Sequence, residues 1–484
     1  MVVGARVKPR WSLGRVLRWL GTAVLVLLLG VPALFYVAFL GIQEASERQW
    51  LGQAPQHAAI NVRSTQAHAV GLIDVGFDSL AARLRLIEAA RESIELEFFI
   101  YELDEASRLI SQALARKAAQ GVKVRILVDF AAPVFKLALQ VASTLKAAGV
   151  QVRYYNTSGL ARIFAMQHRT HRKLLVADRR VAIIGGRNIG NEYFDLSTHY
   201  NFLDSDLLIE GEVASAIADS FELYWGSDWV THPQDTPPDP NGPQLLGPPS
   251  ALETQLAAEL GRHKTQYSIT TCHDMHFITD YPGSGVERRR VYTAIEGLVK
   301  EAQHRIVVES PYLVLRDDGI GMLQSVLERG VKLQILTNTL HSTDAFYTVS
   351  SLADSLDRLK LPNLEIWGYK GKPLQQGDRA TPTTRWGVHA KRAVFDEHTV
   401  LVGTYNLDPR SANLNAELIV ICRHNPALAA SMTQSLQARL GQSRAITGTP
   451  EAGGLAALLE GADAQSVWQM RMATPFVRLF DFLL

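Results

Sequence analysis

Two short stretches of the chain carry the same chemically capable residues at the same spacing. His171 and Lys173 lie two residues apart, and His389 and Lys391 repeat the pair nearer the other end of the chain. Because residues i and i+2 of a strand point to one face, each histidine and its lysine can face the same ligand. Each stretch therefore supplies half of a site, and the chain carries two halves.

The repetition extends beyond these paired side chains. Four residues separate each lysine from an aspartate, and six more separate the aspartate from a glycine that opens a turn ending in asparagine. The aspartates are Asp178 and Asp396, and the turns are Gly185-Gly186-Arg187-Asn188 and Gly403-Thr404-Tyr405-Asn406. A single His-x-Lys pair often arises by chance. Two copies that share the aspartate, the glycine and the asparagine in one register are hard to attribute to chance or to core packing.

These residue types fit phosphodiester chemistry. Lysine charges and amide donors can hold a phosphate and stabilise the charge that develops as phosphorus becomes five-coordinate. One imidazole can attack phosphorus, while the other protonates the departing alkoxide and later activates an incoming hydroxyl. No metal or cofactor is required, because the lysines supply the charge of a cation. The predicted catalytic residues are His171, Lys173, Asp178, His389, Lys391 and Asp396, and the predicted phosphate-binding residues are Asn188 and Asn406.

Each imidazole needs a partner for its other ring nitrogen, because a ring that attacks through one nitrogen carries its proton on the other. Glu417 lies in a strand-like run 28 residues after His389. Asp206 lies in the corresponding run after His171, where Asp204 competes for the same role. We therefore expect Glu417 and Asp206 to orient the two histidines.

Other polar residues near the motifs have weaker claims. Asp178 and Asp396 complete the motifs, but we expect them to fix the turn after a strand rather than to touch substrate. Parallel-sheet enzymes often place functional residues at the ends of strands, where Tyr101, Tyr312 and His341 lie, although packing is an equal alternative. Arg410 could bind a second phosphate or a headgroup, but we expect a solvated surface arginine.

Alternating and apolar runs predict the elements that position the motifs. A strand, a helix and a second strand form a βαβ unit in each half of the chain. The predicted segments of the first half are 93–101, 106–119, 122–129 and 150–155. Those of the second half are 304–312, a helix ending near residue 329, 331–338 and 364–369. A repeat of about 200 residues indicates duplication of a whole domain, not a solenoid.

The N-terminal region predicts a membrane anchor. Residues 19–42 contain no charge, and roughly 20 apolar residues suffice to cross a bilayer. Because basic residues lie in 1–18, the positive-inside rule places the N-terminus in the cytoplasm and the rest of the chain outside. A cleaved signal peptide is the alternative, but its apolar region would be shorter. The remaining predicted divisions are a connector 43–69, a first lobe 70–230, a proline-rich linker 231–250 and a second lobe 251–484.

Composition narrows the classes of function. With 484 residues, 47% of them hydrophobic, the chain can bury large cores, which excludes disorder of the whole chain. A net charge of +1 provides no broad cationic field, so no nucleic-acid partner is expected. Cys272 and Cys422 can form one disulfide, but the sequence does not show whether they do. The run Cys272-His273-Asp-Met-His276 lacks a second pair of ligands, so no metal site is expected there.

The paired H-x-K-x4-D-x6-G-x2-N motifs resemble those of the phospholipase D superfamily, and the resemblance covers nearly all of the chain after the apolar run. Segments 184–194, 202–206, 337–344 and 406–411 are similar to bacterial cardiolipin synthases of the C type. The chain departs from that subfamily at Thr170 and Arg172, where methionine and asparagine are common. The resemblance implies an α/β fold of two homologous phospholipase D-like sandwich lobes with a shared site at their interface.

The resemblance also implies an activity. It predicts transfer of a phosphatidyl group between phospholipids through a phosphohistidine, with His171 as nucleophile and His389 as acid and base. Phosphatidylglycerol is the expected donor, and a phospholipid or another alcohol is the acceptor. The expected location is the bacterial cytoplasmic (inner) membrane, with a single pass and with both lobes on the outer, periplasmic side. Alternatives are a phospholipase D that hydrolyses phospholipids to phosphatidic acid, a nucleic-acid phosphodiesterase, and a membrane-tethered binding protein without activity.

Overall fold

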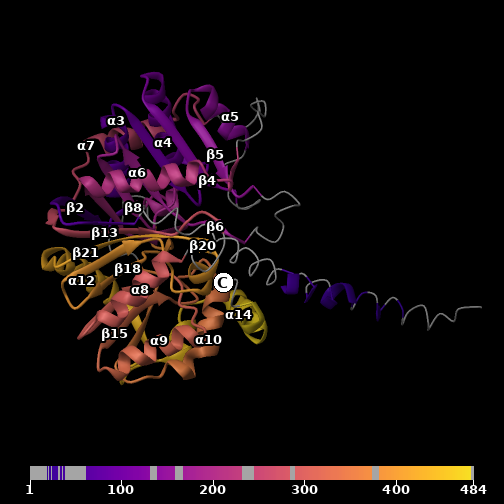
Figure 1. Ribbon diagram of the computed structural model, residues 1–484. Helices are drawn as coiled ribbons and strands as arrows, with labels where there is room; N and C mark the ends of the chain where they lie inside the picture. The colour runs from indigo at the N-terminus through magenta and orange to yellow at the C-terminus, as the bar shows by residue number, and fades with distance from the viewer. Residues whose placement is uncertain are drawn as a thin grey trace, which may run out of the picture.

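The computed structural model describes residues 61–130, 139–157, 167–231, 245–283, 289–372 and 381–480, with scattered positions between 19 and 38. The described residues form two nine-stranded sheets, each covered by helices (Figure 1). In spatial order, the first sheet consists of β11 (Val230–Thr231), β5 (Gln151–Tyr155), β4 (Lys123–Asp129), β3 (Ser93–Phe98), β7 (Leu174–Ala177), β8 (Val181–Gly185), β10 (Asp206–Glu210), β2 (His68–Ile73) and β12 (Ile269–Cys272). The second consists of β1 (Val62–Ser64), β13 (Asp274–Thr279), β21 (Leu418–Arg423), β19 (Thr399–Gly403), β18 (Arg392–Phe395), β14 (Arg305–Glu309), β15 (Lys332–Asn338), β16 (Leu364–Tyr369) and β22 (Ser443–Thr447).

The two sheets correspond strand by strand. The order β5-β4-β3-β7-β8-β10 in the first matches β16-β15-β14-β18-β19-β21 in the second. The directions match as well, because β3 is parallel to β4 and antiparallel to β7, as β14 is to β15 and β18. This agreement confirms the mixed α/β class and fits the duplication expected from the sequence.

Helices cover both faces of the sheets. The helices of the first half are α3 (Gly76–Ala89), α4 (Glu105–Ala119), α5 (Leu139–Ala147) and α6 (Glu212–Trp225), followed by α7 (Ala251–Arg262). Those of the second half are α8 (Arg290–Glu301), α9 (Asp317–Glu328), α10 (Phe346–Ser355), α11 (Pro409–Asn413), α12 (Pro426–Leu440), α13 (Gly454–Leu459) and α14 (Ala464–Phe480). Helices α6 and α12 pack between the two sheets, in one core shared by both halves of the chain. Each lobe also has a core of its own on the outer face of its sheet.

Local sequence signals set the elements that flank the motifs. Asp104 begins α4 with a capping box, in which its side chain accepts from the Ser107 amide and Ser107 bonds back. Helices α4 and α9 are each followed by a glycine with a positive φ angle, Gly121 at +88° and Gly330 at +83°, and then by a strand. Glycine tolerates this left-handed conformation without a Cβ clash, so both helices end at equivalent points.

Strands near the chain's middle cross between the lobes. The strand β12 joins the first sheet, and β13, two residues later, joins the second. In the opposite sense, β1 belongs to the second sheet although it precedes β2 of the first. Helix α7 also packs on α3 and α4 of the first lobe. The observed lobes therefore differ from the expected divisions. The expected connector 43–69 contains β1, which belongs to the second sheet. The expected second lobe, 251–484, supplies α7 and β12 to the first lobe.

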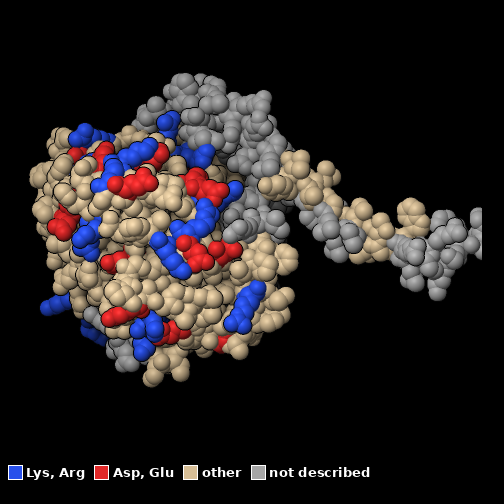
Figure 2. Space-filling model, turned by 90° about the horizontal axis from the view of Figure 1, so that it is seen from below, with Lys and Arg blue, Asp and Glu red and all other residues tan. Residues whose placement is uncertain are grey.

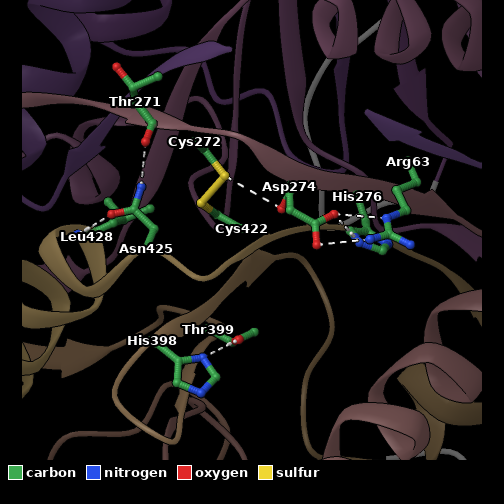
Figure 3. The surroundings of a disulfide bond; sticks show 10 residues. All are labelled: Arg63, Thr271, Cys272, Asp274, His276, His398, Thr399, Cys422, Asn425 and Leu428. Carbon is green, nitrogen blue, oxygen red and sulfur yellow. Dashed lines mark hydrogen bonds and ion pairs between the residues drawn. A yellow bond between two sulfur atoms is a disulfide. The ribbon is translucent and has the colours of Figure 1, made fainter. Parts of the chain in front are cut away.

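A disulfide links the two sheets at this crossing. Cys272 at the end of β12 is bonded to Cys422 of β21, with their Cα atoms 6.1 Å apart (Figure 3). Beside it, the Asn425 side chain donates to the Thr271 carbonyl at 2.9 Å. His276 binds Asp274 at 3.0 Å, so the Cys-His run is occupied by structural contacts. The pairing that the sequence left open is thus a covalent connection between the lobes.

The chain ends bear on the membrane predictions. Ten of the 24 residues of the expected span 19–42 lie outside the described residues, as do residues 232–244 of the expected linker. Within the described part of the chain, no helix has the length and apolar character needed to cross a membrane.

The C-terminal helix α14 packs on α10 and buries Met470 and Val477. Its opposite face leaves three large apolar side chains exposed: Trp468, Met472 and Phe476.

Candidate active site

Main-chain pairing across the lobes places the two motifs. The short strand β6 (Arg169–Thr170) pairs in parallel with β20 (Asn415–Ala416), and β17 (Arg385–Val388) pairs in parallel with β9 (Tyr200–Leu203). One residue beyond these strands, the His171 amide donates to the Ala416 carbonyl at 2.9 Å and the His389 amide donates to the Leu203 carbonyl at 2.7 Å. Each motif histidine therefore lies against a strand of the opposite lobe.

The next residue on each partner strand is a carboxylate that binds the histidine ring. His171 Nδ1 lies 3.0 Å from both carboxylate oxygens of Glu417. His389 Nδ1 lies 2.6 Å from Asp204 Oδ2. Glu417 thus contacts a motif histidine as expected, and the pairing is crossed: each carboxylate binds the histidine of the other lobe.

The expected orienting role of Asp206 is wrong. Asp206 Oδ2 accepts from Arg83 at 2.8 Å and from Arg187 at 3.0 Å, both fully buried with it. The sheet register explains the difference, because Asp206 pairs with Gly185 as Ile419 pairs with Gly403. Counting back two residues from each pair gives Asp204 and Glu417 as equivalents. Register counting from the two glycines is thus the signal that would have identified Asp204.

Glycine in the first motif makes room for this carboxylate. A Cβ atom added to Gly186 would collide with the Asp204 side chain. The equivalent residue of the second motif is Thr404, whose carbonyl accepts from His171 Nδ1 at 3.1 Å. The Thr404 hydroxyl, which has no counterpart in Gly186, accepts from the Leu418 amide at 3.0 Å.

The two motif lysines are buried beside the histidines. Lys173 Nζ donates to the His171 carbonyl at 2.6 Å, and Lys391 Nζ donates to the His389 carbonyl and lies 2.9 Å from His389 Nδ1. Burial, followed by repulsion from Lys391, lowers the pKa of Lys173 to about 7. Burial lowers the pKa of Lys391 to about 8, against the attraction of Asp204 and Glu417. A bound phosphate anion would favour the charged form of both lysines.

The imidazoles are held as neutral rings. Burial, opposed by Glu417, lowers the pKa of His171 to about 4, and burial together with Lys391 lowers the pKa of His389 to about 3. Contacts with His389 and Lys391 outweigh burial and hold the pKa of Asp204 below its usual range. A neutral ring that donates Nδ1–H to a carboxylate leaves the Nε2 lone pair available for attack. Both histidines meet this requirement for a nucleophile.

Comparison with known proteins agrees with this geometry. A family described as "Cardiolipin synthase, PLD-like domain" matches residues 84–225 and 295–440, one segment in each lobe. The chain is an enzyme of the phospholipase D superfamily. Each matched segment contains one His-x-Lys motif, so the duplication seen in the sheets is the duplication of this family's domain.

Relatives in the phospholipase D superfamily span most of the chain. A protein of Helicobacter pylori (strain J99) is 29% identical over 416 residues, covering 80% of this chain and 82% of that protein. Cardiolipin synthase C of Escherichia coli (strain K12) is 26% identical over 377 residues, covering 72% of this chain and 79% of that protein. The crystal structure of phosphatidylserine synthase of Haemophilus influenzae has a similar fold, with a TM-score of 0.63 at 15% identity, covering 90% of this chain and 99% of that one.

The two motif asparagines are buried near the histidines. Asn188 Oδ1 accepts from the Ile100 amide at 3.2 Å, and the Asn188 side chain also hydrogen-bonds Tyr193. Asn406 donates its backbone amide to the Ser411 hydroxyl at 3.1 Å. Within the described residues the side-chain oxygen of Asn406 has no hydrogen-bond partner. Both positions remain compatible with the predicted phosphate contact.

Asp178 and Asp396 lie away from this site, at the far ends of β7 and β18. Asp178 accepts from the amides of residues 91–93, and Asp396 accepts from the amides of residues 303–305. Both residues have positive φ angles, 52° and 47°. This geometry removes them from the predicted catalytic set and agrees with their expected role of fixing a turn. Amide donors lower the pKa of both carboxyls despite partial burial.

The structure shows contacts with other protein groups for Tyr101, Tyr312, His341 and Arg410. Tyr101 is a core residue whose hydroxyl bonds to Ser111, and His341 packs against loop glycines. Tyr312 donates to Asp344 at 3.1 Å. Arg410 is half-buried and donates to the side-chain oxygen and the carbonyl of Gln167.

Sequence reasoning missed several supporting residues. The Ser411 hydroxyl donates to Glu417 Oε1 at 2.8 Å, and the Glu417 amide donates to Asp280 Oδ2 at 3.0 Å. Burial raises the pKa of Asp280 to about 8. The rings of Phe99 and Phe202 lie 5.3 and 4.8 Å from the rings of His171 and His389. Such apolar neighbours carry no motif, so only the fold reveals them.

Proposed function

We propose that the protein is a cardiolipin synthase-like phosphatidyltransferase that moves a phosphatidyl group between phospholipids. The observation that carries the proposal is the crossed pair of contacts, His171 with Glu417 and His389 with Asp204, beside two buried lysines. This arrangement supplies a neutral nucleophile, a second imidazole for proton transfer and two cations for one phosphodiester. The names of the cardiolipin synthase relatives support a phospholipid as substrate.

The reaction would proceed in two displacements. His171 Nε2 attacks phosphorus, an N–P bond forms, and the P–O bond to the departing alcohol breaks. Protonated His389 gives its proton to that alkoxide. In the second step the neutral ring of His389 removes a proton from the incoming hydroxyl, which attacks phosphorus and breaks the N–P bond. The assignment of His171 as nucleophile follows the family resemblance, because both histidines have equivalent surroundings.

One of the two rings must be protonated when the first step begins. Burial favours the neutral form of both histidines in the free protein. An anionic phosphodiester would stabilise an imidazolium beside it and raise the pKa of that ring. Asp204, at 2.6 Å from His389, is the nearer of the two carboxylates and would stabilise the cation. Substrate binding would therefore protonate His389 and so make it the general acid of the first step.

The donor that we propose is phosphatidylglycerol, with glycerol as the departing alcohol, and the acceptor is a phospholipid hydroxyl or another alcohol. Transfer rather than hydrolysis requires that the incoming alcohol outcompete water. Burial of the motif side chains and the aromatic rings beside both histidines support such exclusion. Hydrolysis to phosphatidic acid is the alternative outcome at the same site.

We infer that the lobes work at the outer, periplasmic face of the bacterial inner membrane. The uncharged run 19–42 after a basic N-terminus supports a single-pass anchor with the N-terminus inside. The disulfide Cys272–Cys422 supports an oxidising compartment for the lobes. Exposed Trp468 and Phe476 on α14 support contact with a lipid surface.

A nucleic-acid substrate fits the surface less well. On the face of the molecule shown in Figure 2, acidic and basic side chains are interspersed. Such a mixture does not concentrate the positive charge that phosphate-backbone binding needs. Salt-sensitive DNA binding by the purified protein would favour that alternative.

Product analysis tests the proposal directly. Purified protein in mixed micelles is supplied with phosphatidylglycerol labelled in the phosphatidyl group, with and without an added acceptor phospholipid. We expect labelled diphosphatidylglycerol together with free glycerol. Phosphatidic acid as the sole labelled product would identify a hydrolase, and no product with any phospholipid would reject the proposed function.

A further inference from the structure

An apolar cavity of about 140 Å³ lies in the second lobe, between α8, α9 and the outer face of the second sheet. Most of its lining is hydrocarbon. Side chains from both helices and from the sheet contribute to it: Ile295, Val299, Met322, Leu323, Ile306 and Phe395. Its wall also includes Lys391 and Tyr405 from the second motif. The cavity therefore extends from the helices to the buried Lys391 of the second motif.

The first lobe shows why this space exists. There, α3 packs directly on α4, and Ile110 of α4 is 1% exposed within the core. Counting back from the equivalent glycines, Gly121 and Gly330, places Gly319 of α9 at the position of Ile110. The residue before it is Leu109 in α4 but Asp318 in α9. The second lobe thus lacks the two side chains that would occupy this part of its core.

The cavity has an apolar body and polar ends. Exposed Arg316 and Asp318 contribute to its lining at the start of α9, while buried Lys391 and Asp408 contribute at the motif. An apolar cavity of roughly 150 Å³ can hold a benzene ring. The space is therefore large enough for a short length of hydrocarbon chain, with an anionic group held at the lysine.

We propose that this cavity binds part of an acyl chain of the phospholipid whose phosphate lies at the two motif lysines. The proposal rests on the proposed function, because it assigns the hydrocarbon part of that substrate to a place in the fold. The half-buried side chains of Ile295, Val299, Met322 and Leu323 would be covered by the chain. Hydrocarbon contact would give the second lobe a preference for long-chain lipids over short-chain ones.

Two glycines of α9 provide a matched pair of variants. Gly319 lines the cavity, and a Cβ atom added there would meet Leu315 Cδ2 at 3.2 Å, the flexible end of a side chain. Gly321 lies on the exposed side of the same helix, with nothing within 4 Å of an added Cβ atom. Gly319→Leu should fill the cavity, whereas Gly321→Leu makes the same chemical change outside it. Val299→Phe fills the space from α8 and serves if Gly319→Leu does not fold.

The first test measures binding without turnover. The full chain with His171→Ala is mixed with phosphatidylglycerol that carries a diazirine in its acyl chain, irradiated and digested. We expect label on peptides of α8 and α9, unchanged by Gly321→Leu and lost with Gly319→Leu or Val299→Phe. Label confined to other elements, or label on α8 and α9 that survives both filling variants, would overturn the proposal.

The second test uses the otherwise unchanged protein. The ratio of kcat/KM for a dioleoyl donor to kcat/KM for a dihexanoyl donor should fall about tenfold with Gly319→Leu, equivalent to losing contact with about two methylene groups. Hydrolysis of a water-soluble aryl phosphodiester should not change. An unchanged ratio would overturn the acyl-chain assignment. Labelling of α8 and α9 without transfer by the unchanged protein would reject the proposed function but retain the cavity as a lipid site.

Discussion

His171 of the first lobe is hydrogen-bonded to Glu417 of the second, across a separation of 246 residues in the chain. The reverse contact joins His389 to Asp204, 185 residues before it. Neither lobe can orient its own histidine, because the carboxylate that holds each ring belongs to the other lobe. The packing of the lobes is therefore a requirement of the chemistry as well as of stability.

This crossed arrangement predicts which histidine each carboxylate affects. Glu417→Gln should change the titration of His171 and leave His389 nearly unaltered, and Asp204→Asn should do the reverse. Each change should lower kcat about 100-fold or more, because it removes the acceptor that fixes the ring's tautomer. NMR titration of labelled histidines together with kcat measures both effects. A response of His389 to Glu417→Gln, with His171 unaffected, would contradict the crossed pairing.

Asp206 should matter for stability. It is fully buried between Arg83 and Arg187, so Asp206→Asn leaves two buried cations short of a negative partner. We expect a loss of about 3–5 kcal/mol in the free energy of unfolding. The control is Asp219→Asn, which breaks an exposed pair with Arg179 and should cost about 1 kcal/mol or less. Urea unfolding of the two variants measures the difference. If Asp206→Asn left the stability unchanged but abolished activity, Asp206 would have a role in catalysis after all.

The sequence predicts the strands of the repeat well, because apolar alternation is a local property. The strand expected at 364–369 is β16, and the helix expected at 106–119 is α4. The motif histidines and lysines can also be predicted from the sequence, because duplication repeats their spacing. Their carboxylate partners cannot be predicted in the same way. A register difference of two residues separates Asp206 from Asp204, and the contacts cross between the lobes. The Cys272–Cys422 bond and the support of Glu417 by Asp280 depend on the same long-range arrangement.

The pKa values of the lysines predict a loss of activity at alkaline pH. Burial lowers the pKa of Lys173 to about 7 and that of Lys391 to about 8, and each lysine is positively charged only below its pKa. In the free protein kcat/KM should therefore fall as pH rises through this range. The alkaline limb of kcat should lie at higher pH, because bound phosphate favours the charged lysines. Lys173→Arg keeps its charge and should move the limb of kcat/KM upward. A limb at the same pH in both proteins would contradict the lysine assignment.

The disulfide should stabilise the packed lobes. It closes a separation of 150 residues between the two sheets. Removal of a native disulfide typically costs about 2–5 kcal/mol, so the Cys272→Ser, Cys422→Ser double variant should have a lower Tm. Reductant should lower the Tm of the unchanged protein towards that of the variant and leave the variant unaffected. At 25 °C the variant should retain its activity, because the crossed histidine contacts do not involve the bond. Equal Tm values would show that noncovalent packing alone holds the lobes.

The roles of the two histidines can be separated with a leaving group that needs no proton. A p-nitrophenyl phosphodiester releases a stable phenolate, so general acid catalysis contributes little to the departure step. His389→Ala should therefore give a burst of one equivalent of p-nitrophenol and then stop, since the phosphohistidine on His171 lacks its base. His171→Ala should give no burst. Rapid-mixing absorbance measures the burst, and mass spectrometry of the quenched protein locates the modified histidine. A burst from His171→Ala with none from His389→Ala would reverse the roles, while steady turnover by both variants would reject covalent catalysis by this pair.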